Sequence, residues 1–148
     1  MKTNLSTFQI VGIGIRTNNQ RASQDLGGLW GKFISQNISR KIPNKDSDEI
    51  FSIYTDYESD HSGDYTTIIG YRVNSLENIP AGMVSKEILS TDYQVFTAKG
   101  KFPEAVQQTW GKIWNSNLER SYQTDFEVYG AKSQNMNDAE VEIFISVK

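Results

Sequence analysis

The residues best suited to chemistry in this chain lie on one short predicted strand, Asp125-Phe126-Glu127-Val128-Tyr129. Successive side chains of a strand point to opposite faces, so Glu127 and Tyr129 share one face. A carboxylate beside aromatic rings can bind an organic cation through charge pairing and through cation–π contacts, each worth roughly 0.5–2 kcal/mol. Glu127 is therefore a candidate for a recognition site that carries one charge. The alternative is that Glu127 faces water, because Glu is almost never fully buried unless it is paired.

Burial would decide how this acid behaves. If Glu127 lies among aromatic rings away from water, desolvation should raise its pKa, and a cationic ligand should restore the charged form. The chain contains 7 Phe, 7 Tyr and 3 Trp, which is enough to build such surroundings. The aromatic residues that we expect around the acid are Trp30, Trp110, Trp114, Tyr71 and Tyr129. Two of the three Trp residues lie on the apolar stripes of predicted helices, where a Trp more often belongs to the core.

Other kinds of site find little support. The chain has no Cys, which excludes thiolate nucleophiles, disulfides and cysteine-bound metals. His61 is the single histidine, so no histidine pair can hold a metal. The acidic residues between 56 and 64 lack the spacing of a calcium-binding loop. We expect no cofactor and no metal.

Charge and hydropathy exclude two classes of partner. The chain carries 15 basic and 18 acidic residues, and no basic cluster is longer than the pair Arg40-Lys41. Binding to nucleic acid needs a concentrated basic face, so we expect no direct nucleic-acid partner. The apolar run at residues 8–15 is far shorter than the ~20 residues of a membrane-spanning helix. We therefore expect a cytoplasmic protein with no membrane partner.

An internal repeat organises the chain. Leu-Trp-Gly-Lys-Phe-Ile at residues 29–34 resembles Thr-Trp-Gly-Lys-Ile-Trp at residues 109–114, and Phe-Ser-Ile-Tyr at 51–54 resembles Phe-Glu-Val-Tyr at 126–129. An apolar run, at residues 65–73 or 141–147, then closes each half. This order predicts a single domain over residues 1–148 with halves at about 1–75 and 83–148. The repeats differ most at one position, where Ser52 corresponds to Glu127.

Each half follows the pattern strand, helix, strand, strand. Alternating residues predict strands at 8–15 and 93–97, with a closely approached backbone at the glycines of the first. Apolar residues spaced by three and four predict helices at 23–38 and from Pro103 onward. We expect Ser23 or Asp25 to cap the first helix. Its three glycines (Gly27, Gly28 and Gly31) weaken it by up to ~1 kcal/mol each, so either another segment packs very close there or the helix begins late.

The ordered motifs resemble a known family. They comprise Leu29-Trp30-Gly31-Lys32-Phe33, Gly70-Tyr71, Ile79-Pro80-Ala81-Gly82 and Phe126-Glu127-Val128-Tyr129. The chain resembles the GyrI-like or AraC-type effector-binding domain of bacterial transcription activators, and most of all its stand-alone, integron-cassette-like branch. The resemblance implies an α+β fold of duplicated β-α-β-β units, in which two helices pack on an antiparallel sheet and a pocket lies between the halves. In multidrug-responsive members, the glutamate at the position of Glu127 contacts cationic drugs, so the resemblance implies that Glu127 is the electrostatic anchor of the pocket.

The resemblance implies a small-molecule effector-binding protein for a cationic or amphipathic ligand. Regulators of this family carry a DNA-binding helix-turn-helix ahead of the domain, whereas here the domain starts almost at Met1. We therefore expect ligand binding without direct DNA binding, with a separate regulatory protein as a candidate partner. Two alternatives stay open: a gyrase-inhibitor-like protein-interaction module, and a small hydrolase in which Glu127 is the base and Tyr71 or Tyr129 donates a hydrogen bond. Catalysis is the less favoured interpretation, because the sequence offers no activating partner for the acid.

Overall fold

A computed structural model describes residues 2–60 and 62–148 of the chain. His61, which we do not expect to bind a metal, lies outside the described residues. The elements follow the order β1 (Lys2–Leu5), β2 (Phe8–Thr17), α1 (Ala22–Ser35), α2 (Ile38–Lys41), β3 (Lys45–Thr55), β4 (Tyr65–Val73), β5 (Val84–Ile88), β6 (Thr91–Gly100), α3 (Glu104–Trp114), β7 (Arg120–Tyr129), one 3-10 turn (Ala131–Ser133) and β8 (Ala139–Val147).

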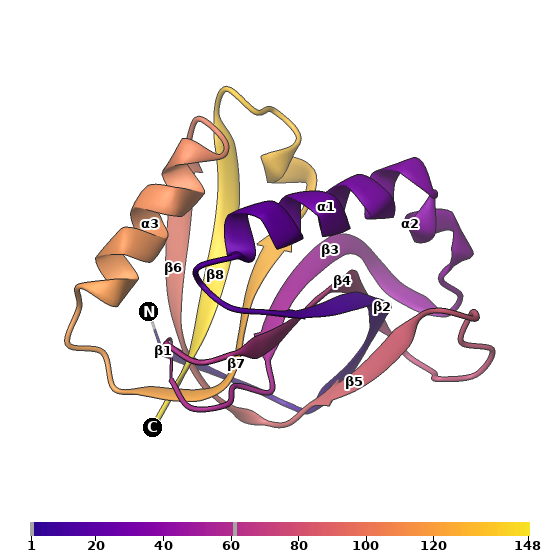
Figure 1. The fold of residues 1–148 in the computed structure, drawn as a ribbon, viewed down its shortest axis with the longest axis horizontal. Helices are drawn as coiled ribbons and strands as arrows, with labels where there is room; N and C mark the ends of the chain where they lie inside the picture. Colours follow the sequence, from indigo (N-terminus) through magenta and orange to yellow (C-terminus); the bar gives the residue numbers. More distant parts are fainter. Residues whose placement is uncertain (1, 61) are drawn as a thin grey trace.

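The strands of the described residues form one antiparallel sheet of eight, in the order β1-β6-β8-β7-β3-β4-β2-β5. The series β2-α1-β3-β4 and β6-α3-β7-β8 repeat the same pattern, and β3 pairs with β7 where the two repeats meet. Helix α1 packs against β2 and β4, and α3 packs against β6 (Figure 1). The predicted α+β fold of two β-α-β-β units is confirmed.

The sheet curls strongly at one end. β1 and β2 follow each other in the chain but would lie about 29 Å apart in a flat sheet of this order. The two residues between them, Ser6 and Thr7, allow a reach of about 10 Å at most. A second short connection joins β5 to β6, and the Ser90 amide donates to Thr7 Oγ1 at 3.0 Å. The opposite edges of the sheet are therefore drawn together, as Figure 1 shows.

Three apolar clusters hold this arrangement. One, rich in Phe, lies on the face away from the helices, where the Phe126 and Phe144 rings stack with centroids 4.7 Å apart. The other two lie under α1 and under α3 respectively. The space between these two helix-covered clusters is where a cavity can form.

Two glycines allow β2 and β4 to pack closely. A Cβ at Gly12 would lie 2.1 Å from the Ile69 carbonyl oxygen, and one at Gly70 would lie 2.1 Å from the Val11 carbonyl oxygen. Only glycine fits at either position. The close backbone approach predicted for this strand is confirmed.

Helix α1 differs from its prediction in its caps and its end. Arg21 occupies the N-cap position without a side-chain hydrogen bond, so the prediction that Ser23 or Asp25 caps the helix is wrong. Asp25 instead accepts a hydrogen bond of 2.7 Å from Thr17 Oγ1 of β2. The helix ends at Ser35, because Asn37 adopts a left-handed backbone (φ 51°) before the short helix α2.

The glycines of α1 are not a packing feature. A Cβ at Gly27, Gly28 or Gly31 would meet no atom within 4 Å, and the helix already begins at Ala22. Both explanations that the sequence suggested, close packing and a late start, are therefore wrong. These glycines weaken α1 without a compensating contact. None of the helices among the described residues combines the length and apolar character that crossing a bilayer requires.

Candidate functional site around Glu127

The repeat places Glu127 beside the axis that relates the two halves. Ser52 and Glu127 lie directly opposite each other in the β3–β7 ladder. They are also equivalent in the repeat, 75 residues apart, as are Tyr54 and Tyr129. When equivalent residues pair across an antiparallel ladder, a pseudo-two-fold axis passes between them. The difference in charge between Ser52 and Glu127 therefore lies directly beside the axis.

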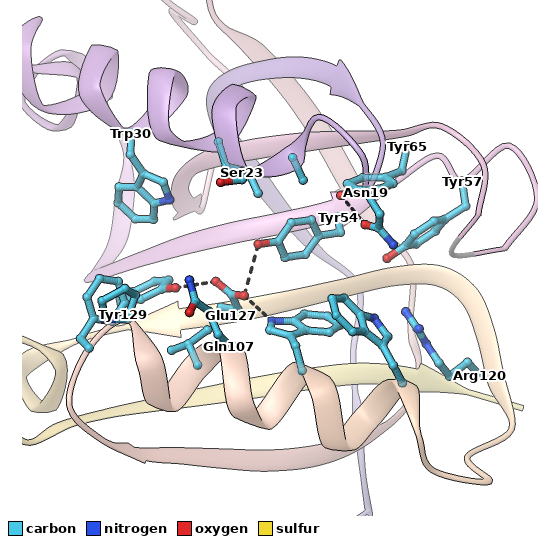
Figure 2. A pocket seen from close by; sticks show the side chains of 17 residues that line it. Asn19, Ser23, Trp30, Tyr54, Tyr57, Tyr65, Gln107, Arg120, Glu127 and Tyr129 are labelled. Carbon is cyan, nitrogen blue, oxygen red and sulfur yellow. Dashed lines mark hydrogen bonds between the residues drawn. The ribbon is translucent and has the colours of Figure 1, made fainter.

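Glu127 is buried, with 4% of its surface exposed. Tyr129 donates its hydroxyl to Oε1 at 2.5 Å, while Tyr54 and Trp110 Nε1 donate to Oε2 at 3.2 and 2.6 Å. Figure 2 shows Tyr54 and Tyr129 converging on the carboxylate from different sides. The alternative that Glu127 faces water is wrong.

No Lys or Arg among residues 2–60 and 62–148 lies within ion-pair distance of Glu127. Burial therefore raises the pKa of Glu127, and the three hydrogen bonds oppose that rise only in part. The Tyr54 hydroxyl has a raised pKa for the same reason, burial first and the neighbouring carboxylate second, so it stays a donor. The site is a buried acid that accepts hydrogen bonds from neutral donors and has no countercharge in the part of the chain that the structure describes.

A cavity of about 420 Å³ opens beside this acid, between α1, α3 and the sheet. Residues of α1, of α3 and of the two positions before α3 line it in pairs that are 80 residues apart, one from each half. These pairs are Ala22 and Phe102, Ser23 and Pro103, Leu26 and Val106, and Trp30 and Trp110. The wall of the cavity therefore follows the internal repeat, with Gln107 and Trp114 added by α3 alone.

Two aromatic pairs face each other across the carboxylate. The Trp30 and Tyr129 rings lie edge to face at 5.3 Å and 78°, and the Trp110 and Tyr54 rings at 5.7 Å and 83°. Each pair joins the helix of one half to the strand of the other. Trp114 extends the second pair, with its ring 6.2 Å from that of Trp110.

Five of the six predicted site residues line this cavity, namely Glu127, Trp30, Trp110, Trp114 and Tyr129. Tyr71 does not. It shares a face of β4 with Tyr65, which lines the cavity, but lies six residues further along, a distance of roughly 20 Å. There Tyr71 stacks on Phe33 beneath the C-terminal half of α1. Its predicted place in the aromatic ring, and any part as a donor beside Glu127, is therefore wrong.

Two residues that we did not predict complete the electrostatics. Tyr54 could have been found from the repeat, since it is the equivalent of Tyr129. Arg120 also lines the cavity, and its Nη2 pairs with Asp125 Oδ2 at 2.7 Å. Asp125 is fully buried and also accepts a hydrogen bond from the Tyr57 hydroxyl. Because Arg120 is already neutralised, Glu127 is the unbalanced charge among the described lining residues.

Comparisons with known proteins agree with this fold. The chain is 26% identical over 153 residues to YobU of Bacillus subtilis, which is described as a putative transcriptional regulator protein. The alignment covers 99% of this chain and 96% of YobU. An integron cassette protein from the mobile metagenome of Vibrio cholerae superposes with a TM-score of 0.80 at 29% identity, over 100% of this chain and 95% of that one.

A third similar structure is that of SAV2435 bound to tetraphenylphosphonium. It has a TM-score of 0.84 and 22% identity, and the match covers 100% of this chain and 93% of that one. At this identity the likeness shows a shared fold. The profile of the family described as "integron-associated effector binding protein" (Cass2) matches residues 3–147. The chain belongs to this family of effector-binding proteins, the integron-cassette branch that its motifs predict.

Proposed function

We propose that this chain binds a singly charged organic cation with aromatic or apolar substituents, and that Glu127 is the countercharge. One observation carries the proposal. A buried carboxylate lies in an aromatic cavity, and all the hydrogen bonds that it accepts from the described residues come from uncharged donors. Such a charge is costly to hold away from water until an opposite charge compensates it. A bound cation supplies that compensation.

The size and lining of the cavity support a small organic ligand. A volume of about 420 Å³ falls in the range of ~300–1,000 Å³ that is typical of ligand pockets. The Trp and Tyr rings around Glu127 offer faces for cation–π contacts, which favour a cation with its charge spread beneath a hydrocarbon surface. Tetraphenylphosphonium, the molecule bound to SAV2435, is such a cation and suggests the first probes.

The test compares a cation with its neutral counterpart. Methyltriphenylphosphonium and triphenylphosphine oxide present the same three rings, with and without a charge. Isothermal titration calorimetry should show binding of the cation that is much tighter than that of the oxide. Truncating one partner of a buried charge pair costs about 2–5 kcal/mol, so Glu127→Gln should weaken cation binding by at least ~30-fold.

Glu142→Gln is the matched control. Glu142 is exposed on β8 and alternates with the residues that pack beneath α3, so the substitution removes one negative charge away from the cavity. It should change cation affinity by less than about twofold, since an exposed charge is screened. Equal affinity of the Glu127→Gln and parent proteins for the phosphonium, with both proteins folded, would refute the proposed function. A protein-interaction role that needs no ligand would instead give no phosphonium binding by either protein.

A further inference from the structure

The pseudo-two-fold axis provides a second place where the cavity could carry its charge. Ser52 lies across the axis from Glu127 and is fully buried. The donors to Glu127 are Tyr129, two residues along its own strand; Tyr54, on the paired strand; and Trp110, on the helix of its own half. Each of these donors has a counterpart with respect to Ser52.

The counterparts follow from the repeat. Tyr54 lies two residues along the strand of Ser52, Tyr129 lies on the paired strand, and Trp30 lies on the helix of the first half. The Ser52 hydroxyl is already 3.5 Å from the Tyr54 hydroxyl, which in turn donates to Glu127. The repeat therefore gives position 52 the same set of candidate donors that Glu127 uses, with Tyr54 and Tyr129 common to both positions.

The aromatic walls repeat in the same way. The pair of Trp30 and Tyr129 and the pair of Trp110 and Tyr54 have similar ring separations and nearly equal, close to perpendicular angles. A positive centre near Glu127 is therefore flanked by two comparable aromatic pairs. A ligand with one aromatic group can use one of these pairs, and a ligand with two can use both.

We propose that the cavity selects a monocation that carries an aromatic group on each side of its charge, bound across the pseudo-two-fold axis, and that position 52 is an equivalent place for the countercharge. This inference rests on the proposed function and specifies the ligand. A second acid at position 52 beside Glu127 would place two like charges opposite each other, which is unfavourable. The serine thus restricts the site to ligands with a single charge.

A series of three ammonium ions tests the shape of the ligand. Tetramethylammonium has no aromatic group, benzyltrimethylammonium has one, and dibenzyldimethylammonium has two. By calorimetry the second ring should increase affinity about tenfold, a gain of about 1.4 kcal/mol. In Trp30→Leu this second gain should disappear, since only the pair of Trp110 and Tyr54 remains.

Transposing the charge tests the equivalence of the two positions. Glu127→Ser alone should lose binding of dibenzyldimethylammonium by at least ~30-fold. Adding Ser52→Glu to Glu127→Ser keeps the side-chain composition of the site and should restore affinity to within about tenfold of the parent. A folded double variant that stays as weak as Glu127→Ser would overturn the equivalence, and if the double variant does not fold, the ammonium series decides the proposal by itself.

The outcomes separate the two levels of the proposal. If the cations bind and depend on Glu127, but the second ring adds less than twofold or Trp30→Leu weakens all three equally, the two-sided ligand is refuted and the proposed function stands. If neither these cations nor methyltriphenylphosphonium bind, or if binding is indifferent to Glu127→Gln, the proposed function fails and this inference fails with it.

Discussion

Replacing the three exposed glycines of α1 with alanine should stabilise the protein considerably. Gly27, Gly28 and Gly31 lie inside the helix, with no atom within 4 Å of an added Cβ. An interior glycine costs a helix ~1 kcal/mol relative to alanine, so the triple variant should gain up to about 3 kcal/mol. For a chain of this length, 1 kcal/mol shifts the melting temperature by about 2–4 °C, which gives an expected rise of about 6–12 °C.

Thermal unfolding followed by far-UV circular dichroism, with urea unfolding at 25 °C, measures this gain for the single and triple variants. Gly82→Ala is the matched control. A Cβ at Gly82 also meets no atom within 4 Å, but the backbone there has φ 82°, in the left-handed region. Alanine should therefore destabilise the protein by about 1–2 kcal/mol at this position.

An unchanged or lower melting temperature in the triple α1 variant would refute the reasoning. It would mean that the added methyl groups meet other atoms, or that residues 27–31 are not held in a regular helix. A rise in Gly82→Ala would be equally damaging, because it would remove the link between backbone conformation and the effect of the substitution.

Three further predictions follow from the site and the sheet. Gly12→Ala should cost more than about 3 kcal/mol in urea unfolding, since its Cβ would meet the Ile69 carbonyl oxygen at 2.1 Å; a loss below 1 kcal/mol would contradict the close approach. Because burial raises the pKa of Glu127, its ionisation lowers stability as pH rises through that pKa, so Glu127→Gln should raise the melting temperature at pH 7 and lose this advantage below about pH 4; a pH-independent difference would argue against a buried acid. Asp125→Asn should cost about 3–5 kcal/mol, because it breaks the buried pair with Arg120, and a nearly unchanged urea midpoint would show that the pair is not needed.

The sequence predicted the repeated elements well because they have strong local patterns. The apolar runs at residues 65–73 and 141–147 fall within β4 and β8, and the stripes of spaced apolar residues agree with α1 and α3. β1 and β5 were not predicted. They are short, and their sequences, KTNL and VSKEI, mix polar and apolar residues without a clear period. Such edge strands form because β6 and β2 offer unpaired backbone groups, which local sequence does not reveal.

The site was predicted only as far as local patterns reach. Alternation along β7 correctly placed Glu127 and Tyr129 on one face, but alternation gives the face of a residue and not its distance from the site. Tyr71 was wrongly included for that reason. Tyr54 was overlooked although the repeat equates it with Tyr129. The expected helix cap at Ser23 or Asp25 failed because the helix already begins at Ala22, so both residues lie inside its first turn, where Asp25 accepts a hydrogen bond from Thr17 instead.

The position of Glu127 beside the axis bears on why one polypeptide contains both halves. In a dimer of identical β-α-β-β subunits, any residue beside the axis occurs twice. Such an assembly therefore has either no acid or two acids at that place, and it cannot have a single one. Two facing carboxylates would share a proton or repel each other. Joining the subunits into one chain lets Ser52 and Glu127 differ. A lone negative charge at the centre of a symmetric cavity is thus available to a fused protein and closed to a homodimer.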